Sequence, residues 1–131
     1  MRVQVKDFMS VPVFTTVVDS SVGYVRELME RKRVHAIPIV EVNDSEVNKD
    51  VIIRGIITAT DLRGVTDESI PVQEVMTERV FVITKNANAQ AAAQMMLRQK
   101  VHHLVVMDEG HIVGMLSALD FVKLVADHQL S

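Results

Sequence analysis

Two short segments each place a hydroxyl three residues before a carboxylate, and they are the strongest candidates for chemistry in the sequence. They are Thr58-Ala-Thr-Asp61 and Ser117-Ala-Leu-Asp120. A fixed carboxylate can accept hydrogen bonds from both adjacent hydroxyls of a ribose, and the hydroxyl with nearby helix amides can meet a phosphate oxygen. The same spacing resembles a capping box, which closes the start of a helix without a ligand. Each segment alone leaves both interpretations open.

The two segments occupy equivalent places in an internal repeat. Shifting the chain by 67 residues aligns residues 5–41 with residues 72–108. Beyond residues 42–50 the offset falls to 59, which places Asp61 on Asp120 and reveals an eight-residue insertion in the first copy. We expect that insertion to form a solvated hairpin loop. The repeats are assigned to residues 1–66 and 67–131.

Each copy predicts the same order of elements: strand, helix, two strands and a short helix. Apolar, β-branched and aromatic runs predict the strands, and apolar residues at three- to four-residue spacing predict the long helices. The strands are expected over residues 13–17, 36–40, 51–58, 80–84, 103–107 and 111–117. The long helices are expected over residues 22–32 and 89–99, capped by Ser20 or Ser21 and by Asn88. Short helices are expected to begin at Thr58 and Ser117.

This order predicts an α/β (α+β) fold built from two βαββα units. A single copy would be marginally stable, because one layer of helices covers only one face of its sheet. The uncovered faces are therefore expected to pack sheet to sheet about a pseudo-twofold axis. Two symmetry-related clefts should then open between the copies.

Composition and charge exclude several classes of function. The 131 residues carry a net charge of −3, so nucleic acid is not an expected partner. The absence of cysteine excludes disulfides and thiol chemistry. No uncharged run is long enough to cross a bilayer and no signal peptide follows Met1, so we expect a cytoplasmic protein with no membrane partner.

The sequence predicts neither an enzyme nor a metal site. It contains no nucleophile–base pair and no glycine-rich phosphate loop. His102 and His103 are adjacent, so on a strand they point to opposite faces and cannot both bind one ion without distortion. Any output activity is expected in another polypeptide or in residues missing from this sequence.

The duplicated series of motifs resembles the CBS-domain pair, also called a Bateman module. The first copy contains DFMSVPVFTTVVDSSVGYVRELMERKRVHAIPIVE and IIRGIITATDLRGV, and the second runs from EVMTERVFVITK to HIVGMLSALDFVKLV. The resemblance implies a regulatory module that binds AMP, ADP or ATP, with S-adenosylmethionine or NAD(H) as alternatives, and with Mg²⁺ as an optional companion of a nucleotide. It also implies a homodimer that signals to a regulated protein, which the sequence does not identify.

The resemblance also implies two clefts, each combining the hydroxyl and carboxylate of one copy with strand edges of the other. Carried over by position, the first cleft comprises Thr58, Asp61, Thr77, Phe81, Val82, Val101, His102 and His103. The second comprises Ser117, Asp120, Ser10, Phe14, Thr15, Val34, His35 and Ala36. In these sets, the backbone at residues 14–15 or 81–82 would contact the adenine edge. The phenylalanines and valines are equally well explained as plain strand core.

The sequence departs from the family pattern in two ways. Some nucleotide-sensing members have an arginine directly after the histidine that aligns with His35 and His102. This chain has Ala36 and His103 at these positions, which puts tight triphosphate binding in doubt. If phosphate recognition survives, we expect it in the Asp61 cleft, with His102, His103 and Lys100 nearby. Val105 also stands where the family usually has a proline. The alternative function is an interaction or dimerisation module with vestigial clefts, in which the histidines are structural.

Overall fold

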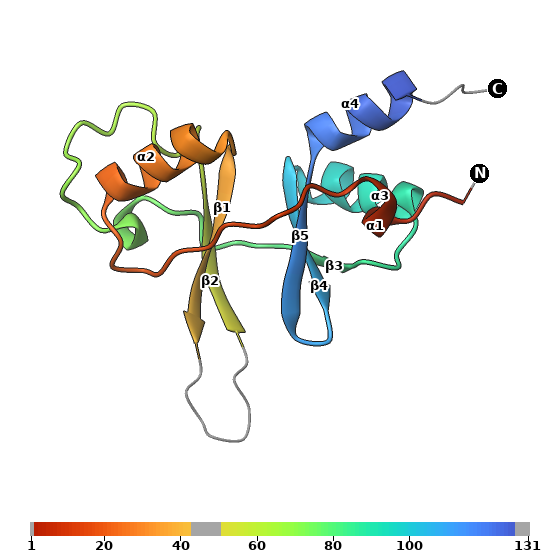
Figure 1. The fold of residues 1–131 in the computed structure, drawn as a ribbon, viewed down its shortest axis with the longest axis horizontal. Helices are drawn as coiled ribbons and strands as arrows, with labels where there is room; N and C mark the ends of the chain where they lie inside the picture. The colour runs from red at the N-terminus through yellow and green to blue at the C-terminus, as the bar shows by residue number, and fades with distance from the viewer. Residues whose placement is uncertain (1, 43–50, 128–131) are drawn as a thin grey trace. The chain divides into compact units, whose positions relative to one another are not determined.

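The computed structural model describes residues 2–42 and 51–127, which form two compact units (Figure 1). One unit is Phe14–Val80, and the other combines residues 1–13 with residues 81–131. Each unit therefore holds the main elements of one repeat together with the opening segment of the other. The mixed class of helices and sheets is confirmed. The predicted hairpin loop of the insertion lies outside the described residues.

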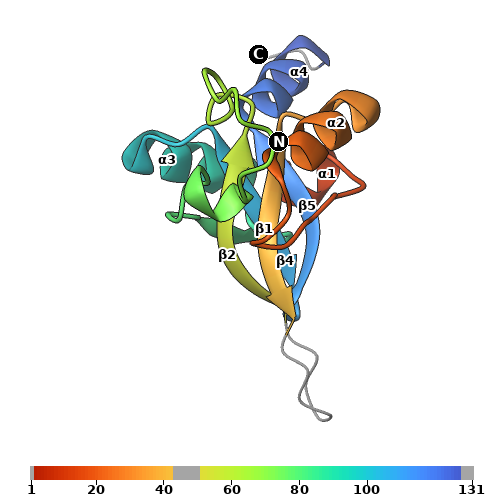
Figure 2. The same ribbon diagram turned by 90° about the vertical axis from the view of Figure 1, so that its left-hand side faces the viewer.

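The Phe14–Val80 unit is built on a two-stranded antiparallel hairpin. Strand β1 (Ala36–Val42) pairs with β2 (Val51–Thr58), and helix α2 (Val22–Lys32) lies beside them (Figures 1 and 2). The apolar stripe of α2 packs onto one face of the hairpin, as the three- to four-residue spacing of its apolar side chains predicts. The buried cluster comprises Val22, Val25, Leu28, Met29, Ile37, Ile39, Ile57, Leu62 and Val72.

The other unit has a three-stranded sheet. Strand β3 (Val82–Thr84) runs parallel to β4 (His103–Asp108), which pairs antiparallel with β5 (His111–Ser117). Three helices accompany it: α1 (Val5–Phe8), which the sequence analysis did not predict, α3 (Ala89–Gln99) and α4 (Ala118–Asp127). The buried cluster comprises Val5, Ile83, Ala92, Met96, Leu104, Val106 and Leu116.

The two long helices begin and end by the same devices. Ser21 and Asn88 cap their first turns, accepting from backbone amides at 3.1 and 2.7 Å, as predicted. Arg33 and Lys100 end them in the left-handed conformation, with φ of 55° and 56°. Each helix is therefore followed by an equivalent turn, which leads into β1 in the first repeat and into β4 in the second.

The strand predicted over residues 13–17 does not form. In the first repeat only Thr16 pairs with β1, as a single parallel bridge to Ile39. The aligned β3 is a strand of three residues, shorter than the predicted range of 80–84.

Pro38 explains this difference between the repeats. In the second repeat the amide of Val105 donates to the Phe81 carbonyl at 3.0 Å, at the point where β3 joins the sheet. Proline has no N–H, so Pro38, which aligns with Val105, cannot offer that bond to the first segment. The presence of valine at position 105, in place of the proline at the equivalent position 38, thus allows the additional strand pairing in the second repeat.

The short helix predicted to begin at Thr58 is also absent. Residues 59–64 form successive turns instead, with backbone bonds from Leu62 to Ala59 and from Arg63 to Thr60 of 3.3 and 3.1 Å. Gly64, with φ of 79°, ends this segment in a conformation that a helix cannot continue. At the equivalent place in the second repeat no glycine intervenes, and α4 follows Ser117 as predicted.

Candidate ligand-binding site

Thr58 and Asp61 are tied together at the end of β2. The Thr58 amide donates to Asp61 Oδ2 at 2.9 Å, and the Asp61 amide donates to Thr58 Oγ1 at 3.2 Å. Ser117 and Asp120 make the same pair of bonds at the end of β5, at 2.9 and 3.3 Å. The capping geometry is therefore present in both repeats. It also fixes each carboxylate in place, and a carboxylate has further lone pairs for other donors.

The opening segment of the second repeat brings a hydroxyl to Asp61. Thr77 pairs with Ile56 through two backbone hydrogen bonds of 2.8 and 2.9 Å. This pairing places Thr77 Oγ1 at 3.2 Å from Asp61 Oδ1 and 3.4 Å from Asp61 Oδ2. The structure thus brings Thr58, Asp61 and Thr77 together within the Phe14–Val80 unit.

The opening segment of the first repeat does the same for Asp120. Ser10 pairs with Met115 of β5 through backbone bonds of 2.8 and 3.0 Å. Ser10 Oγ then donates to Asp120 Oδ1 at 2.8 Å. Ser10, Ser117 and Asp120 are therefore neighbours within the unit that contains β5.

The other predicted residues lie in a different unit from the carboxylate with which the sequence groups them. The residues grouped with Asp61 that lie in the unit of β5 are Phe81, Val82, Val101, His102 and His103. The residues grouped with Asp120 that lie in the Phe14–Val80 unit are Phe14, Thr15, Val34, His35 and Ala36. Phe14, Val34, Phe81 and Val101 each pack against the core of their own unit. The grouping across units stays a prediction.

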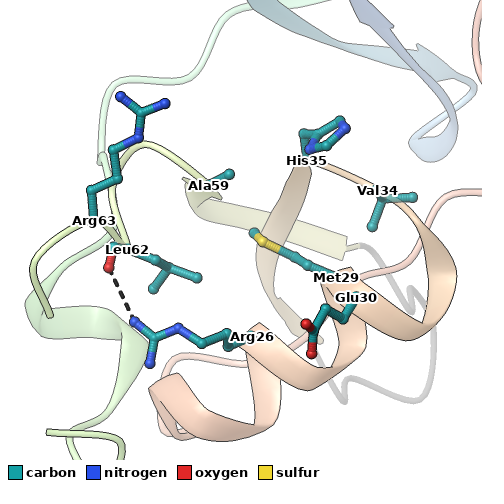
Figure 3. A pocket seen from close by; sticks show the side chains of 8 residues that line it. All are labelled: Arg26, Met29, Glu30, Val34, His35, Ala59, Leu62 and Arg63. Carbon is teal, nitrogen blue, oxygen red and sulfur yellow. Dashed lines mark hydrogen bonds between the residues drawn. The ribbon is translucent and has the colours of Figure 1, made fainter. Parts of the chain in front are cut away.

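A cavity of about 380 Å³ opens in the Phe14–Val80 unit, between α2, the start of β1 and the turn after β2 (Figure 3). Its lining comprises Arg26, Met29, Glu30, Val34, His35, Ala59, Leu62 and Arg63. Aliphatic side chains share this lining with two arginines, a histidine and one glutamate. The sequence analysis grouped His35 with Asp120, but here His35 lies beside the turn that carries Asp61. The sequence analysis did not identify Arg26 or Arg63 as cavity residues, because nothing in their spacing distinguishes them from other surface arginines.

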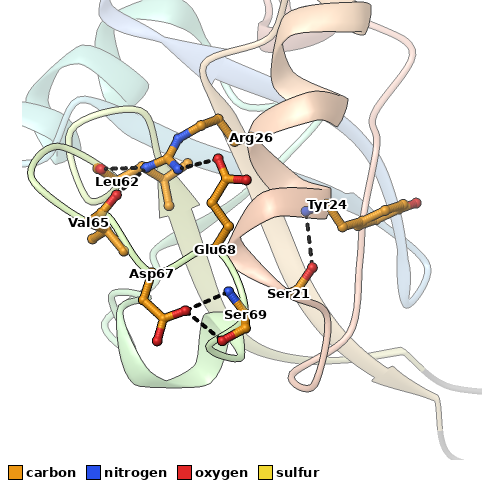
Figure 4. A network of polar contacts seen from close by, with 8 residues as sticks. All are labelled: Ser21, Tyr24, Arg26, Leu62, Val65, Asp67, Glu68 and Ser69. Carbon is orange, nitrogen blue, oxygen red and sulfur yellow. Dashed lines mark hydrogen bonds and ion pairs between the residues drawn. The ribbon is translucent and has the colours of Figure 1, made fainter.

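Arg26 fastens α2 to the turn that follows β2 (Figure 4). Its Nη2 donates to the carbonyl oxygens of Leu62 and Val65 at 3.1 and 2.8 Å, and its Nη1 lies 3.2 Å from Glu68 Oε1. Because the turn forms one wall of the cavity, Arg26 fixes the shape of that wall. Further along, hydrogen bonds from the hydroxyl and amide of Ser69 hold the pKa of Asp67 below its ordinary value.

A second cavity, of about 440 Å³, lies in the unit of β5. Its lining comprises Arg2, Val3, Asp7, Phe8, Asp120, Lys123, Leu124 and Asp127. The three aspartates outnumber the two basic side chains, so the local field disfavours an anion. Across residues 2–42 and 51–127, no three His, Cys, Asp or Glu side chains are placed to share a metal ion. No helix in this described part is both long and apolar enough to cross a membrane.

Comparison with known proteins identifies the family. The family model of the CBS domain matches residues 5–67 and again residues 72–127. The chain therefore belongs to the CBS-domain family and is a tandem CBS pair, a regulatory module. The structural likeness agrees: the CBS domain pair of protein MJ0100, in complex with 5′-methylthioadenosine and S-adenosyl-L-methionine, has a TM-score of 0.82 at 21% identity, covering 98% of this chain and 100% of that one.

Other relatives place the pair within longer proteins. Inosine-5′-monophosphate dehydrogenase from Halobacterium salinarum is 33% identical over 108 residues, which are 80% of this chain and 20% of the dehydrogenase. The same enzyme from Methanocaldococcus jannaschii is 29% identical, over 85% of this chain and 21% of the enzyme. This chain thus spans about a fifth of the length of these curated relatives. A solved acetoin utilization protein (AcuB) from Vibrio cholerae, 24% identical, has a TM-score of 0.76 over 97% of this chain and 93% of that one.

Proposed function

We propose that this CBS pair binds an adenosine-containing small molecule, catalyses no reaction itself, and passes the signal to a partner protein. The observation that carries the proposal is a carboxylate three residues after the end of a strand in each repeat, Asp61 after β2 and Asp120 after β5. Each is fixed by a backbone amide and faced by a hydroxyl from the opening segment of the other repeat. Paired ribose hydroxyls suit such an acceptor, because hydrogen bonds to a charged group contribute about 1.5–3 kcal/mol each. One or both carboxylates would serve.

The absence of an arginine at Ala36 and His103 bears on the class of ligand. A triphosphate carries charge that these positions do not neutralise. The MJ0100 pair is in complex with two adenosyl compounds, and neither contains a phosphate group. We therefore place S-adenosylmethionine, which has no phosphate, and AMP, which has only one, ahead of ATP.

A thermal-shift panel tests this proposal. The panel contains AMP, ADP, ATP, NADH, S-adenosylmethionine and 5′-methylthioadenosine. A ligand at one hundred times its dissociation constant stabilises the folded state by about 2.7 kcal/mol, which raises the melting temperature by several degrees. We expect at least one adenosine compound to do so. Guanosine and cytidine monophosphates are the controls, since they present the same ribose but another base.

A folded protein that responds to none of these compounds would contradict the proposal. A response of equal size to all nucleoside monophosphates would contradict the adenosine assignment, while leaving ribose binding in place. A bound ligand can change the state of a second protein only if two conformations of the module have different affinities for that ligand.

A second function, self-association, is favoured by an exposed apolar stripe on α4. Leu119, Val122 and Val125 are 53%, 61% and 52% exposed and recur every three residues along the helix. Phe121 packs against the core cluster of its own unit. A helix that is apolar on two sides is expected to be covered on both. We propose that the stripe packs against a second copy of the chain, forming a homodimer.

Val122→Lys is expected to convert that dimer to a monomer. The change places a charge in the middle of the apolar stripe, where a dimer would bury it without a partner. Sedimentation velocity across a hundredfold range of protein concentration would measure the mass. Lys123→Ala, a substitution of the exposed neighbouring residue, is the control and should leave the dimer intact. A wild-type protein that is monomeric throughout the range would contradict self-association.

A further inference from the structure

Asp120 has little capacity left for a ligand. The residue is only 5% exposed. Its Oδ1 accepts from Ser10 Oγ at 2.8 Å, and its Oδ2 accepts from the amide and the hydroxyl of Ser117 at 2.9 and 3.2 Å. A ribose would have to displace the Ser10 hydroxyl, which is held in place by the backbone pairing of its own residue with β5.

Asp61, at the equivalent position, is more open. Asp61 is partly exposed to solvent, whereas Asp120 is buried. One short bond, from the Thr58 amide, reaches Oδ2 at 2.9 Å. The hydroxyl of Thr77 is shared between both oxygens at the longer distances of 3.2 and 3.4 Å. Oδ1 therefore has one long, divided hydrogen bond, and a ribose hydroxyl can replace it at small cost.

The hydroxyls beside the two carboxylates differ as well. The Ser117 hydroxyl accepts a hydrogen bond from the Asp120 amide at 3.3 Å and donates one to Asp120 Oδ2 at 3.2 Å. The Thr58 hydroxyl accepts from the Asp61 amide, but its proton has no acceptor among residues 2–42 and 51–127. Thr58 thus keeps a donor available for a ligand oxygen, and Ser117 does not.

From these differences in exposure and hydrogen bonding we infer that Asp61 is the ligand acceptor and Asp120 is a structural carboxylate. Asp120 fastens the opening segment of the chain, through Ser10, to the end of β5. The module then takes one ligand molecule per chain, although its two repeats carry the same motif. This inference rests on the proposed function, because it assigns that function to one of the two carboxylates.

Paired variants test the assignment by calorimetry and thermal unfolding. The probes are AMP and S-adenosylmethionine, titrated separately into wild type, Asp61→Ala and Asp120→Ala. Wild type is expected to bind one equivalent per chain. Asp61→Ala should weaken binding by more than about 100-fold, since two charge-assisted hydrogen bonds are lost. Asp120→Ala should keep one equivalent, with affinity within about threefold, and melt roughly 5–10 °C lower because buried donors lose their acceptor.

Ser10→Ala is the second variant, should Asp120→Ala fail to fold. It removes only the hydroxyl on Asp120, so it should lower the melting temperature by a few degrees and leave affinity and stoichiometry unchanged. Two equivalents in wild type would overturn the inference while supporting the proposed function, as would weakened binding in Asp120→Ala or Ser10→Ala. A folded wild type that binds neither probe would overturn both.

Discussion

Leu116→Ala is expected to lower the free energy of unfolding by about 3–4 kcal/mol, within the range measured for leucines truncated in well-packed cores. Leu116 of β5 is fully buried, and its direct partner across the strand pair, Leu104 of β4, is buried too. Neither strand can slide to fill the space, because the backbone hydrogen bonds between β4 and β5 fix their pairing register. Equilibrium unfolding in urea, followed by circular dichroism, would measure the loss.

Leu97→Ala supplies a control with the same chemical change. Leu97 lies on α3 and is 79% exposed, so its truncation should alter stability by no more than about 0.5 kcal/mol. If the two variants lost equal stability, the core around β4 and β5 would not be packed as described. A lower slope of the free energy of unfolding against urea, without a change in midpoint, would instead indicate a more compact unfolded state.

The sequence was sufficient for the features that local patterns determine. The caps at Ser21 and Asn88 are where the helix periodicity begins, and both make the expected hydrogen bonds. Strands β1 and β4 begin with their predicted apolar runs and extend beyond them by two residues and one residue, respectively. The duplicated motif also led to the fixed carboxylates, because a hydroxyl three residues before an acid makes the same local bonds in each copy.

Features that depend on distant pairing were beyond such patterns. The local pattern around Ser10 does not indicate that it donates to Asp120, which lies 110 residues further along the chain; only the resemblance to the CBS pair grouped the two residues. The loss of the first predicted strand depends on Pro38, a residue of the neighbouring strand, and not on the β-branched segment itself. The different exposure of Asp61 and Asp120 likewise follows from what packs around them. Equivalent motifs thus lie in different surroundings.

The last prediction concerns two glycines at equivalent places in the repeats. Gly55 of β2 and Gly114 of β5 each lie where an opening segment crosses the strand. A Cβ on Gly55 would fall 2.8 Å from the Thr77 carbonyl oxygen and 2.7 Å from Met76 Sδ. The three atoms nearest to a Cβ on Gly114 would all belong to the side chain of Met9, with its Sδ the nearest. A thioether can rotate away, whereas a backbone carbonyl cannot move alone.

Gly55→Ala is therefore expected to cost about 2–3 kcal/mol, as overpacking against a fixed neighbour does. The Thr77 carbonyl is held at 2.8 Å by the Ile56 amide, so it can retreat only by breaking that bond. Gly114→Ala should change stability by less than about 1 kcal/mol, because the lower entropy of the unfolded chain offsets the shift of Met9.

Urea unfolding of the two single variants, with ligand titration beside it, distinguishes these cases. Because the backbone of Thr77 pairs with Ile56, two residues before Thr58, displacing it should shift Thr58 and Asp61 and weaken ligand binding in Gly55→Ala, and leave binding unchanged in Gly114→Ala. Equal losses of stability in both variants would show that the opening segments are free to shift. A destabilised Gly55→Ala that still binds with wild-type affinity would show that the position of Thr77 has no bearing on the Asp61 carboxylate.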